Sequence, residues 1–277
     1  MTTFHIEAHY PHPILSLSLR GDGCGLNWDS GIHMAKISDN TWAADVTCQS
    51  STEVLQMKVL QSDKTWMIGA NHFANVRSTN STNIYPWFNT YQGSLTVIDN
   101  VHSSEMGNNR SVIVYTPPSY MENTLKVHKN VLVMHDGQNL FNTKTAFMGN
   151  AWMCQNSLDQ SIVGGTTEEI LVVAPYNTSE RMDEYTYVQD PEYGGGKGDL
   201  YLDFLESTII PLAQSNFRVE ISRDTLGILG SSLGGLISCY AGWTRSDVYG
   251  KVGCMSSSFW WDNQDFQTNL ITKSTPA

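Results

Sequence analysis

Ser232 lies in the pentapeptide Gly230-Ser231-Ser232-Leu233-Gly234, after a short apolar stretch and before a run of small and apolar residues. A G-x-S-x-G sequence between a strand and a helix places the serine on a sharp turn, with its hydroxyl above the sheet. The dipole of the following helix and the amide of Leu233 would then face a developing oxyanion. The pattern predicts a serine nucleophile for acyl transfer. The alternatives are an accidental G-x-S-x-G and, less well in register, Ser231.

A second oxyanion donor is expected from the turn after an earlier strand. The apolar stretch 131–134 is followed by His135 and then by Asp136-Gly137-Gln138. Gly137 would let the amides of Gly137 and Gln138 approach a substrate, because glycine has no side chain in the way. An ordinary turn is the alternative. His135 is expected to pack or to brace this loop rather than to act as a general base.

Two different sequence patterns predict two domains that position these residues. Residues 1–92 contain short stretches of alternating apolar and polar residues broken by turns, which is typical of a small antiparallel β-sandwich. The polar segment 77–94 is typical of a linker or of a long loop that joins the two domains. Residues 93–277 alternate continuous apolar strands with helices, which predicts an α/β domain with a mostly parallel sheet. Pro211 is expected to kink or break the predicted helix 199–217.

Composition and charge argue against several classes of function. The net charge of −11 and the lack of a Lys/Arg cluster argue against a nucleic-acid partner, because phosphate binding needs a basic surface. No apolar run approaches the length of a membrane span, and no His/Cys pair has metal-ligand spacing, so neither a membrane nor a metal is expected. The start of the chain has no signal-peptide pattern, so a cytoplasmic location is expected, with secretion left open.

The five cysteines are scattered along the chain. Such an odd, dispersed set predicts reduced, buried thiols. The sequence leaves open a pair between Cys24 and Cys48 in an oxidising compartment.

Segments of the second half resemble the esterase family of α/β-hydrolases that contains enterobactin, feruloyl and acetyl-xylan esterases. They occur in family order within residues 93–265, as "VIVYTPPSY", "VLVMHDGQNLF", "ERMDEYTY", "SRDTLGILGSSLGGL" and "GCMSSSFWW". The resemblance implies an α/β-hydrolase fold and carboxylic ester hydrolysis through an acyl-serine on Ser232, without a cofactor. It also implies that Arg181 holds an anionic or phenolic group of the substrate. The alternative for Arg181 is an ion pair with Glu184 that braces the loop in which both residues lie.

In this family the catalytic triad runs in the order Ser, acid, His along the chain. All eight histidines precede Ser232, and Asp262 and Asp265 follow the last strand too closely by family spacing. The triad acid and histidine are therefore expected to be missing from this chain, with the hydrolase domain incomplete at its C-terminus. Such a domain would have an unpaired apolar edge near residues 252–261. The alternative function is a catalytically inactive glycan-binding protein with a remnant esterase domain.

Residues 4–78 resemble a starch-binding module of the family 20 type, on "GLNWDSG", Trp42, "QMKVL" and "GANHFANV". The resemblance implies a buried Trp42 and a sugar site made by Trp28, Lys58 and Trp66, with Asn71 nearby. An exposed indole stacks on the apolar face of a pyranose ring, so a glycan is an expected partner. A small-molecule ester is the partner that the esterase resemblance implies. The alternative for the two site tryptophans is packing in the core of the sandwich. The oligomeric state stays open.

Overall fold

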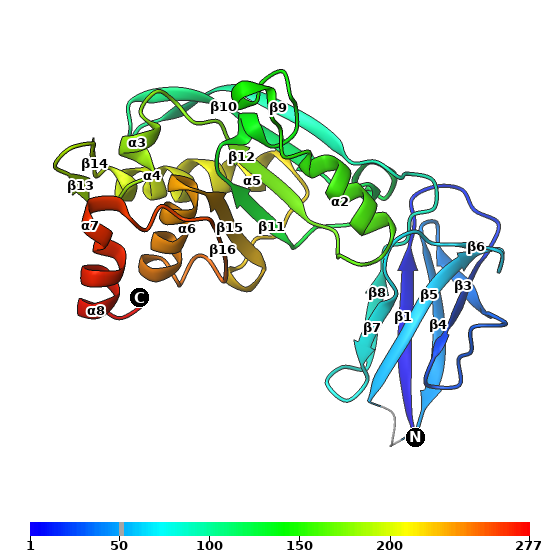
Figure 1. The fold of residues 1–277 in the computed structure, drawn as a ribbon. Helices are drawn as coiled ribbons and strands as arrows, with labels where there is room; N and C mark the ends of the chain where they lie inside the picture. Colours follow the sequence, from blue (N-terminus) through cyan, green and yellow to red (C-terminus); the bar gives the residue numbers. More distant parts are fainter. Residues whose placement is uncertain (50–52) are drawn as a thin grey trace. The chain divides into compact units, whose positions relative to one another are not determined.

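The computed structural model describes residues 1–49 and 53–277, and the chain divides into two compact units (Figure 1). The first unit comprises Met1–Gly93, Pro117–Lys126 and Asn156–Glu168, and the second comprises Ser94–Thr116, Val127–Gln155 and Glu169–Ala277. The first division, after Gly93, lies next to the expected boundary at residues 92 and 93. Two later segments nevertheless group with the first unit, which is therefore discontinuous in sequence.

Strands β1 to β8 of the first unit hydrogen-bond in the order β6-β5-β2-β3-β4-β1-β8, with β7 paired to β5. Their bounds are β1 (Thr2–His9), β2 (Leu17–Asp22), β3 (Ile32–Ser38), β4 (Thr41–Cys48), β5 (Val54–Gln61), β6 (Thr65–Trp66), β7 (His72–Asn75) and β8 (Ser81–Ile84). In β1 the alternating residues Phe4, Ile6 and Ala8 are buried, because successive side chains of a strand point to opposite faces.

Part of the segment 77–94 forms a strand, although its polar composition predicts a linker or a long joining loop. Residues Ser81–Ile84 form β8, which pairs in parallel with β1, so the sheet is not wholly antiparallel. Trp87 and Phe88 are each only 4% exposed. Burial of these two aromatic side chains stabilises the packing of an otherwise polar segment in the unit.

The second unit has the mixed α/β fold that the alternation of strands and helices predicts. Its sheet has the order β16-β15-β11-β12-β10-β9. The strands are β9 (Ser94–Ser103), β10 (Asn108–Thr116), β11 (Val131–Met134), β12 (Leu171–Pro175), β15 (Leu226–Ser231) and β16 (Lys251–Met255). β11, β12, β15 and β16 pair in parallel, whereas β9 and β10 pair antiparallel. A small hairpin, β13 (Gln189–Asp190) with β14 (Gly194–Gly195), lies outside this sheet.

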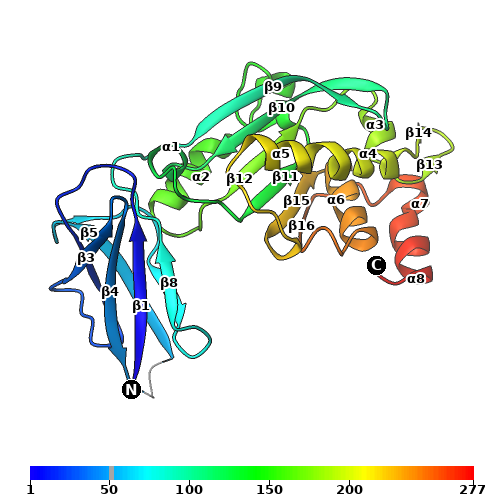
Figure 2. The same ribbon diagram turned by 180° about the vertical axis from the view of Figure 1, so that it is seen from behind.

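The helices are short, and several cover the sheet of the second unit. Their bounds are α1 (Ser119–Glu122), α2 (Cys154–Val163), α3 (Arg181–Glu184), α4 (Gly198–Phe204), α5 (Ile210–Asn216), α6 (Leu233–Thr244), α7 (Trp261–Asp265) and α8 (Ile271–Lys273). Helix α6 packs on β15 and β16. Helices α4 and α5 lie in front of the sheet in Figure 2 and behind it in Figure 1, so they lie on one side of it. No helix among residues 1–49 and 53–277 is long and apolar enough to cross a bilayer.

The predicted helix 199–217 does not break at Pro211. Residues Leu205–Ile209 form a π-helical turn between α4 and α5, and the backbone stays in the right-handed helical region at Leu205, Ile209 and Ile210. Proline donates no hydrogen bond to the preceding turn. The wider π-helical turn lies just before Pro211, where the proline lacks an N–H donor.

The prediction of reduced cysteines is wrong for four of the five. Cys24 pairs with Cys48, as the sequence left open, and Cys239 pairs with Cys254. Cys154 is the free cysteine of the described residues. The second disulfide joins α6, the helix that follows Ser232, to β16, the edge strand that pairs with β15.

A buried carboxylate, Glu122, organises part of the first unit. It is 6% exposed and accepts hydrogen bonds from the backbone amides of Phe88, Asn89 and Thr90 at 2.7–2.9 Å, and from the hydroxyl of Tyr10 at 2.9 Å. Burial by itself raises the pKa of Glu122, but these donors favour the charged form and hold its pKa below the usual range.

We expect Glu122→Gln to lower the free energy of unfolding of the first unit by about 2 kcal/mol, because a neutral amide replaces a charged acceptor of several hydrogen bonds. The folded-state pKa of Glu122 is depressed, so its stabilisation is present above the ordinary carboxyl range and is lost as pH falls through the folded pKa. Denaturant unfolding at several pH values tests this. Glu53→Gln, at an exposed glutamate paired with exposed Arg77, should change stability little. Equal effects of the two substitutions would contradict the prediction.

Candidate active site

Ser232 occupies the turn between β15 and α6 in a backbone conformation that non-glycine residues rarely adopt. Its φ is 60° and its ψ is −120°, and its side chain is exposed. A Cβ at Gly230 would lie 2.6 Å from the backbone of Gly234, and one at Gly235 would lie 2.5 Å from Ser257 Oγ. A Cβ at Gly234 would make only ordinary contacts. The glycines at 230 and 235 therefore permit the sharp turn.

Backbone and side-chain contacts hold Ser232 in this conformation. Its N–H donates to the carbonyl of Met255 at 3.0 Å, and its carbonyl accepts from the N–H of Ser258 at 3.0 Å. Its hydroxyl lies 3.1 Å from the hydroxyl of Ser258. Leu233 begins α6, and amides in the first turn of a helix have no partner within the helix. The amide of Leu233 therefore has no partner within the helix, and its role as an oxyanion donor stays a prediction.

The loop with Gly137 and Gln138 follows β11, the parallel neighbour of β15. The N–H of His135 donates to the carbonyl of Leu229 in β15 at 3.1 Å. A Cβ at Gly234 would lie 3.4 Å from that of His135, so the turn after β11 contacts the start of α6. A Cβ at Gly137 would lie 2.3 Å from the carbonyl oxygen of Ala174, so this position requires glycine. Parallel strands end at the same edge of a sheet, which brings both predicted donors to the edge where Ser232 lies.

Arg181 clamps this loop through Asp136. Its Nε and Nη2 donate to the two carboxylate oxygens of Asp136 at 2.7 and 2.8 Å. Asn177 adds a bond from its Nδ2 to Asp136 Oδ1 at 2.5 Å, and its N–H donates to the side-chain oxygen of Gln138 at 3.1 Å. The guanidinium of Arg181 also lies over the ring of Tyr185. Its side chain is 29% exposed, and contact with a substrate stays a prediction.

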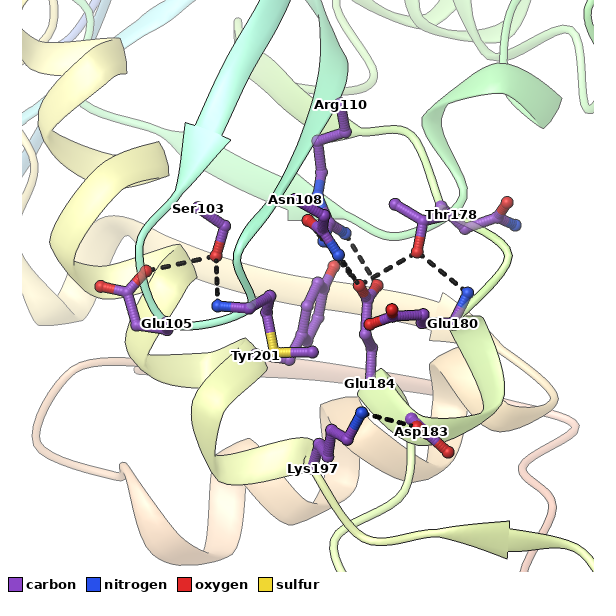
Figure 3. A network of polar contacts seen from close by, with 12 residues as sticks. Ser103, Glu105, Asn108, Arg110, Thr178, Glu180, Asp183, Glu184, Lys197 and Tyr201 are labelled. Atoms are coloured by element: carbon purple, nitrogen blue, oxygen red, sulfur yellow. Dashed lines mark hydrogen bonds and ion pairs between the residues drawn. The ribbon is translucent and has the colours of Figure 1, made fainter.

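Glu184, the expected alternative partner of Arg181, pairs with Arg110 instead. Figure 3 shows its carboxylate meeting Arg110, Asn108 and Thr178. The shortest Arg110–Glu184 distance is 2.6 Å, and both side chains are almost wholly buried. The pair joins β10 to α3, the short helix that begins with Arg181. The prediction of an Arg181–Glu184 pair is therefore wrong.

His135 lies beneath the Ser232 turn rather than on the surface. It is 2% exposed, and its Nδ1 lies 2.9 Å from the hydroxyl of Tyr201. Its Nε2 has no hydrogen-bond partner among the described residues. Burial lowers the pKa of His135 to about 4, so the ring is neutral at pH 7. This placement agrees with the prediction of a packing or bracing role.

The Ser232 hydroxyl is bonded to Ser258, and the two acids Asp262 and Asp265 are bonded elsewhere. No cluster of three or more His, Cys, Asp or Glu side chains there is arranged to hold a metal ion. Asp265 accepts from the hydroxyl of Tyr187 at 2.8 Å, and the N–H of Asp262 donates to Asp190. Ser258, which no sequence argument singled out, is the polar partner of the Ser232 hydroxyl.

The predicted sugar-site residues of the first unit are brought together in part. The rings of Trp28 and Trp66 lie 6.1 Å apart between centroids, and Trp66 is 39% exposed. Lys58 donates from Nζ to the carbonyl of Gly69 at 2.7 Å and is therefore engaged by the backbone. Asn71 is half-buried and lies two residues after Gly69, the residue whose carbonyl Lys58 contacts.

The first unit also contains a buried tryptophan, Trp42, and an ion pair between Arg20 and Asp63. Trp42 is 2% exposed, which confirms the predicted core position. Arg20, to which no sequence pattern points, pairs with Asp63 at 2.9 Å and lies over the ring of Trp66. The residues are far apart in sequence, and only the pairing of β2 with β5 brings them close.

We expect Arg181→Gln to lower the free energy of unfolding of the second unit by about 3 kcal/mol, because it leaves the largely buried carboxylate of Asp136 without its charged partner. Denaturant unfolding measures the loss. Amide hydrogen exchange should become faster in residues 136–140, because the loop loses its clamp.

Arg223→Gln is the matched control, since Arg223 pairs with Asp224 at the exposed surface, where ion pairs contribute at most about 1 kcal/mol. Unchanged exchange in residues 136–140 of Arg181→Gln would show that the clamp does not hold the loop.

Comparisons with known proteins concern mainly the second unit. Residues 103–273 match the family described as "Putative esterase". The chain is 30% identical over 162 residues to the protein named "Uncharacterized protein YbbA" of Bacillus subtilis, an alignment that spans 58% of this chain and 62% of that protein. It is 35% identical over 71 residues to the "Siderophore triacetylfusarinine C esterase" of Aspergillus fumigatus, which covers 25% of this chain and 24% of that protein.

A solved structure shares the fold. The crystal structure of an "IroE-like serine hydrolase" from Shewanella oneidensis superposes with a TM-score of 0.50 at 20% identity, and covers 65% of this chain and 54% of that one. At this identity the likeness concerns the fold alone. In each of these three comparisons the chain spans less than two thirds of the length of the other protein.

Proposed function

Because this chain belongs to the esterase family, we propose that it is a carboxylic ester hydrolase with Ser232 as the nucleophile. One observation carries the proposal: the exposed serine lies on a strained turn between an interior parallel strand and a helix. Strained backbone is retained only where the surroundings hold it, and it concentrates at functional sites. Two loops with glycines that tolerate no side chain meet at the same edge.

In the proposed reaction, Ser232 Oγ attacks the ester carbonyl carbon and the alcohol leaves, which forms an acyl-serine. Water then attacks the acyl-serine, which releases the acid and restores the hydroxyl. The amide of Leu233 and those of Gly137 and Gln138 stabilise the negative oxygen of each tetrahedral intermediate. The reaction needs no cofactor. It does need a general base, and we assign that role to no described residue, because His135 is buried and bonded to Tyr201.

The substrate we propose is a small-molecule ester. The Aspergillus relative is named for hydrolysis of a siderophore ester, and the Shewanella structure is named as a serine hydrolase. An anionic or phenolic group on the substrate could meet the exposed part of Arg181, whose Nη1 is not used in the bonds to Asp136.

A second proposed activity is glycan binding by the first unit. If the esterase unit is active, its ester substrate is then attached to a glycan; if it is not, the protein acts as a glycan-binding module. The observation that favours it is the neighbouring indoles of Trp28 and Trp66, since Trp66 is exposed although tryptophan usually packs inside. Lys58 and Asn71 complete the proposed site. If the hydrolase unit is inactive, glycan binding is the alternative function of the chain.

The two disulfides bear on where the protein works. Disulfides persist in oxidising compartments and are rare in the cytosol. The pairs Cys24–Cys48 and Cys239–Cys254 therefore favour an oxidising compartment over the cytoplasmic location that the sequence analysis expects.

We expect Ser232→Ala to reduce the rate of p-nitrophenyl acetate hydrolysis by about 100-fold or more, because the nucleophile is lost. Initial rates at equal protein concentration measure the effect. Ser231→Ala is the matched control: Ser231 is the adjacent residue of β15 and its hydroxyl is not the one on the turn. Equal rates for Ser232→Ala and the unchanged protein would defeat the proposal.

We expect Trp66→Ala to reduce retention on amylose or glycogen about 10-fold, because loss of one stacking ring removes about 1–2 kcal/mol of contact. Retention in a pull-down at several polysaccharide concentrations measures it. Trp260→Ala, an exposed tryptophan of the second unit, is the control and should leave retention unchanged. If Trp66→Ala binds as well as the unchanged chain, the sugar site is not there.

A further inference from the structure

We propose that Ser258 is a positioning residue that orients the hydroxyl of Ser232, an inference that rests on the proposed nucleophile role of Ser232. The two hydroxyl oxygens lie 3.1 Å apart, within hydrogen-bond distance. Ser258 is only 4% exposed, whereas Ser232 is exposed. The buried Ser258 hydroxyl therefore supplies a fixed hydrogen-bond partner for the exposed Ser232 hydroxyl.

The backbone holds Ser258 against the Ser232 turn. The N–H of Ser258 donates to the carbonyl of Ser232, and the N–H of Ser232 donates to the carbonyl of Met255. The segment from Met255 to Ser258 is thereby tied to both sides of the turn. The N–H of Trp261 donates to the carbonyl of Ser258 at 3.1 Å, which fixes the segment from its other end.

The covalent and steric surroundings of this segment leave it little room to move. Cys254, the residue directly before Met255, is joined by a disulfide to Cys239 in α6. A Cβ on Gly235 would come within 2.8 Å of the Met255 carbonyl oxygen, so the helix and the segment are in close contact. Ser258 therefore keeps its position whatever conformation the exposed Ser232 side chain adopts.

The physical effect of this contact is on the conformation of the nucleophile. A serine side chain has three staggered rotamers, and an exposed hydroxyl without a partner populates more than one of them. A hydrogen bond of ordinary net strength favours one rotamer by about 2- to 13-fold. The favoured rotamer is the one whose oxygen stays beside Ser258. Ser258 forms no bond with the substrate in this role and acts only through Ser232.

The neighbouring Ser257 is a matched control within the same segment. Its hydroxyl is buried but has no hydrogen-bond partner among the described residues. Removing it takes away the same group at almost the same place without touching the Ser232 hydroxyl. A general disturbance of the segment would affect Ser257→Ala and Ser258→Ala alike, whereas a positioning role concerns Ser258 only.

The test compares kcat and KM for p-nitrophenyl acetate in the full chain and its variants. We expect Ser258→Ala to lower kcat about 3- to 10-fold with KM unchanged, because the contact acts on the nucleophile rather than on substrate binding. Ser258→Thr, which keeps a hydroxyl, should restore at least half of kcat. The rate at which a fluorophosphonate labels Ser232 should fall and recover in the same order. Thermal unfolding of each variant shows whether it is folded.

The outcomes separate this inference from the proposed function. If Ser232→Ala hydrolyses the ester as fast as the unchanged chain, the proposed function itself fails. If Ser232→Ala is inactive but Ser258→Ala keeps its full kcat and labelling rate, only the positioning role fails. An equal loss in Ser257→Ala also overturns it. If Ser258→Ala does not fold, the nearly isosteric Ser258→Cys decides, since a thiol is a weak hydrogen-bond partner and an unchanged rate would contradict the role.

Discussion

The geometry of the candidate site depends on a backbone constraint, the positive φ of Ser232. A non-glycine residue in so sparsely populated a conformation costs about 1–3 kcal/mol, and it persists only where the surroundings determine it. Here the amide and carbonyl of Ser232 are each bonded to the segment from Met255 to Ser258. Gly230 and Gly235 let the strand, the helix and that segment approach one another. The same contacts that hold the strain also leave the hydroxyl exposed at the sheet edge.

Two ion pairs connect the sheet to the loop beside Ser232 and fix the position of that loop. Arg110 in β10 holds Glu184, the last residue of α3, and Arg181, the first residue of α3, holds Asp136. Buried ion pairs contribute little net stability, because desolvation offsets their attraction. Their bidentate geometry instead restricts where the loop after β11 can lie. That restriction is what a site with fixed amide donors requires.

Sequence reasoning succeeded where the signal is local and failed where it depends on contacts between distant residues. The turn at Ser232 was predictable, because strand, glycines and helix occur within one short stretch. The linker prediction failed at β8, since a polar segment became a strand by pairing with β1 and burying Trp87. The Cys239–Cys254 disulfide could not be foreseen from spacing, because it depends on how α6 packs on β16.

The sequence by itself determined the α/β pattern of the second half, the turn that bears Ser232 and the glycine of the 136–138 loop, because each depends on residues close together in the chain. Tertiary structure alone decided that Arg181 meets Asp136 rather than Glu184 and that the Ser232 hydroxyl meets Ser258. Those partners lie 45 and 26 residues apart. The order of the parallel strands in the sheet sets which loops meet at its edge, and one chain's local propensities do not encode that order.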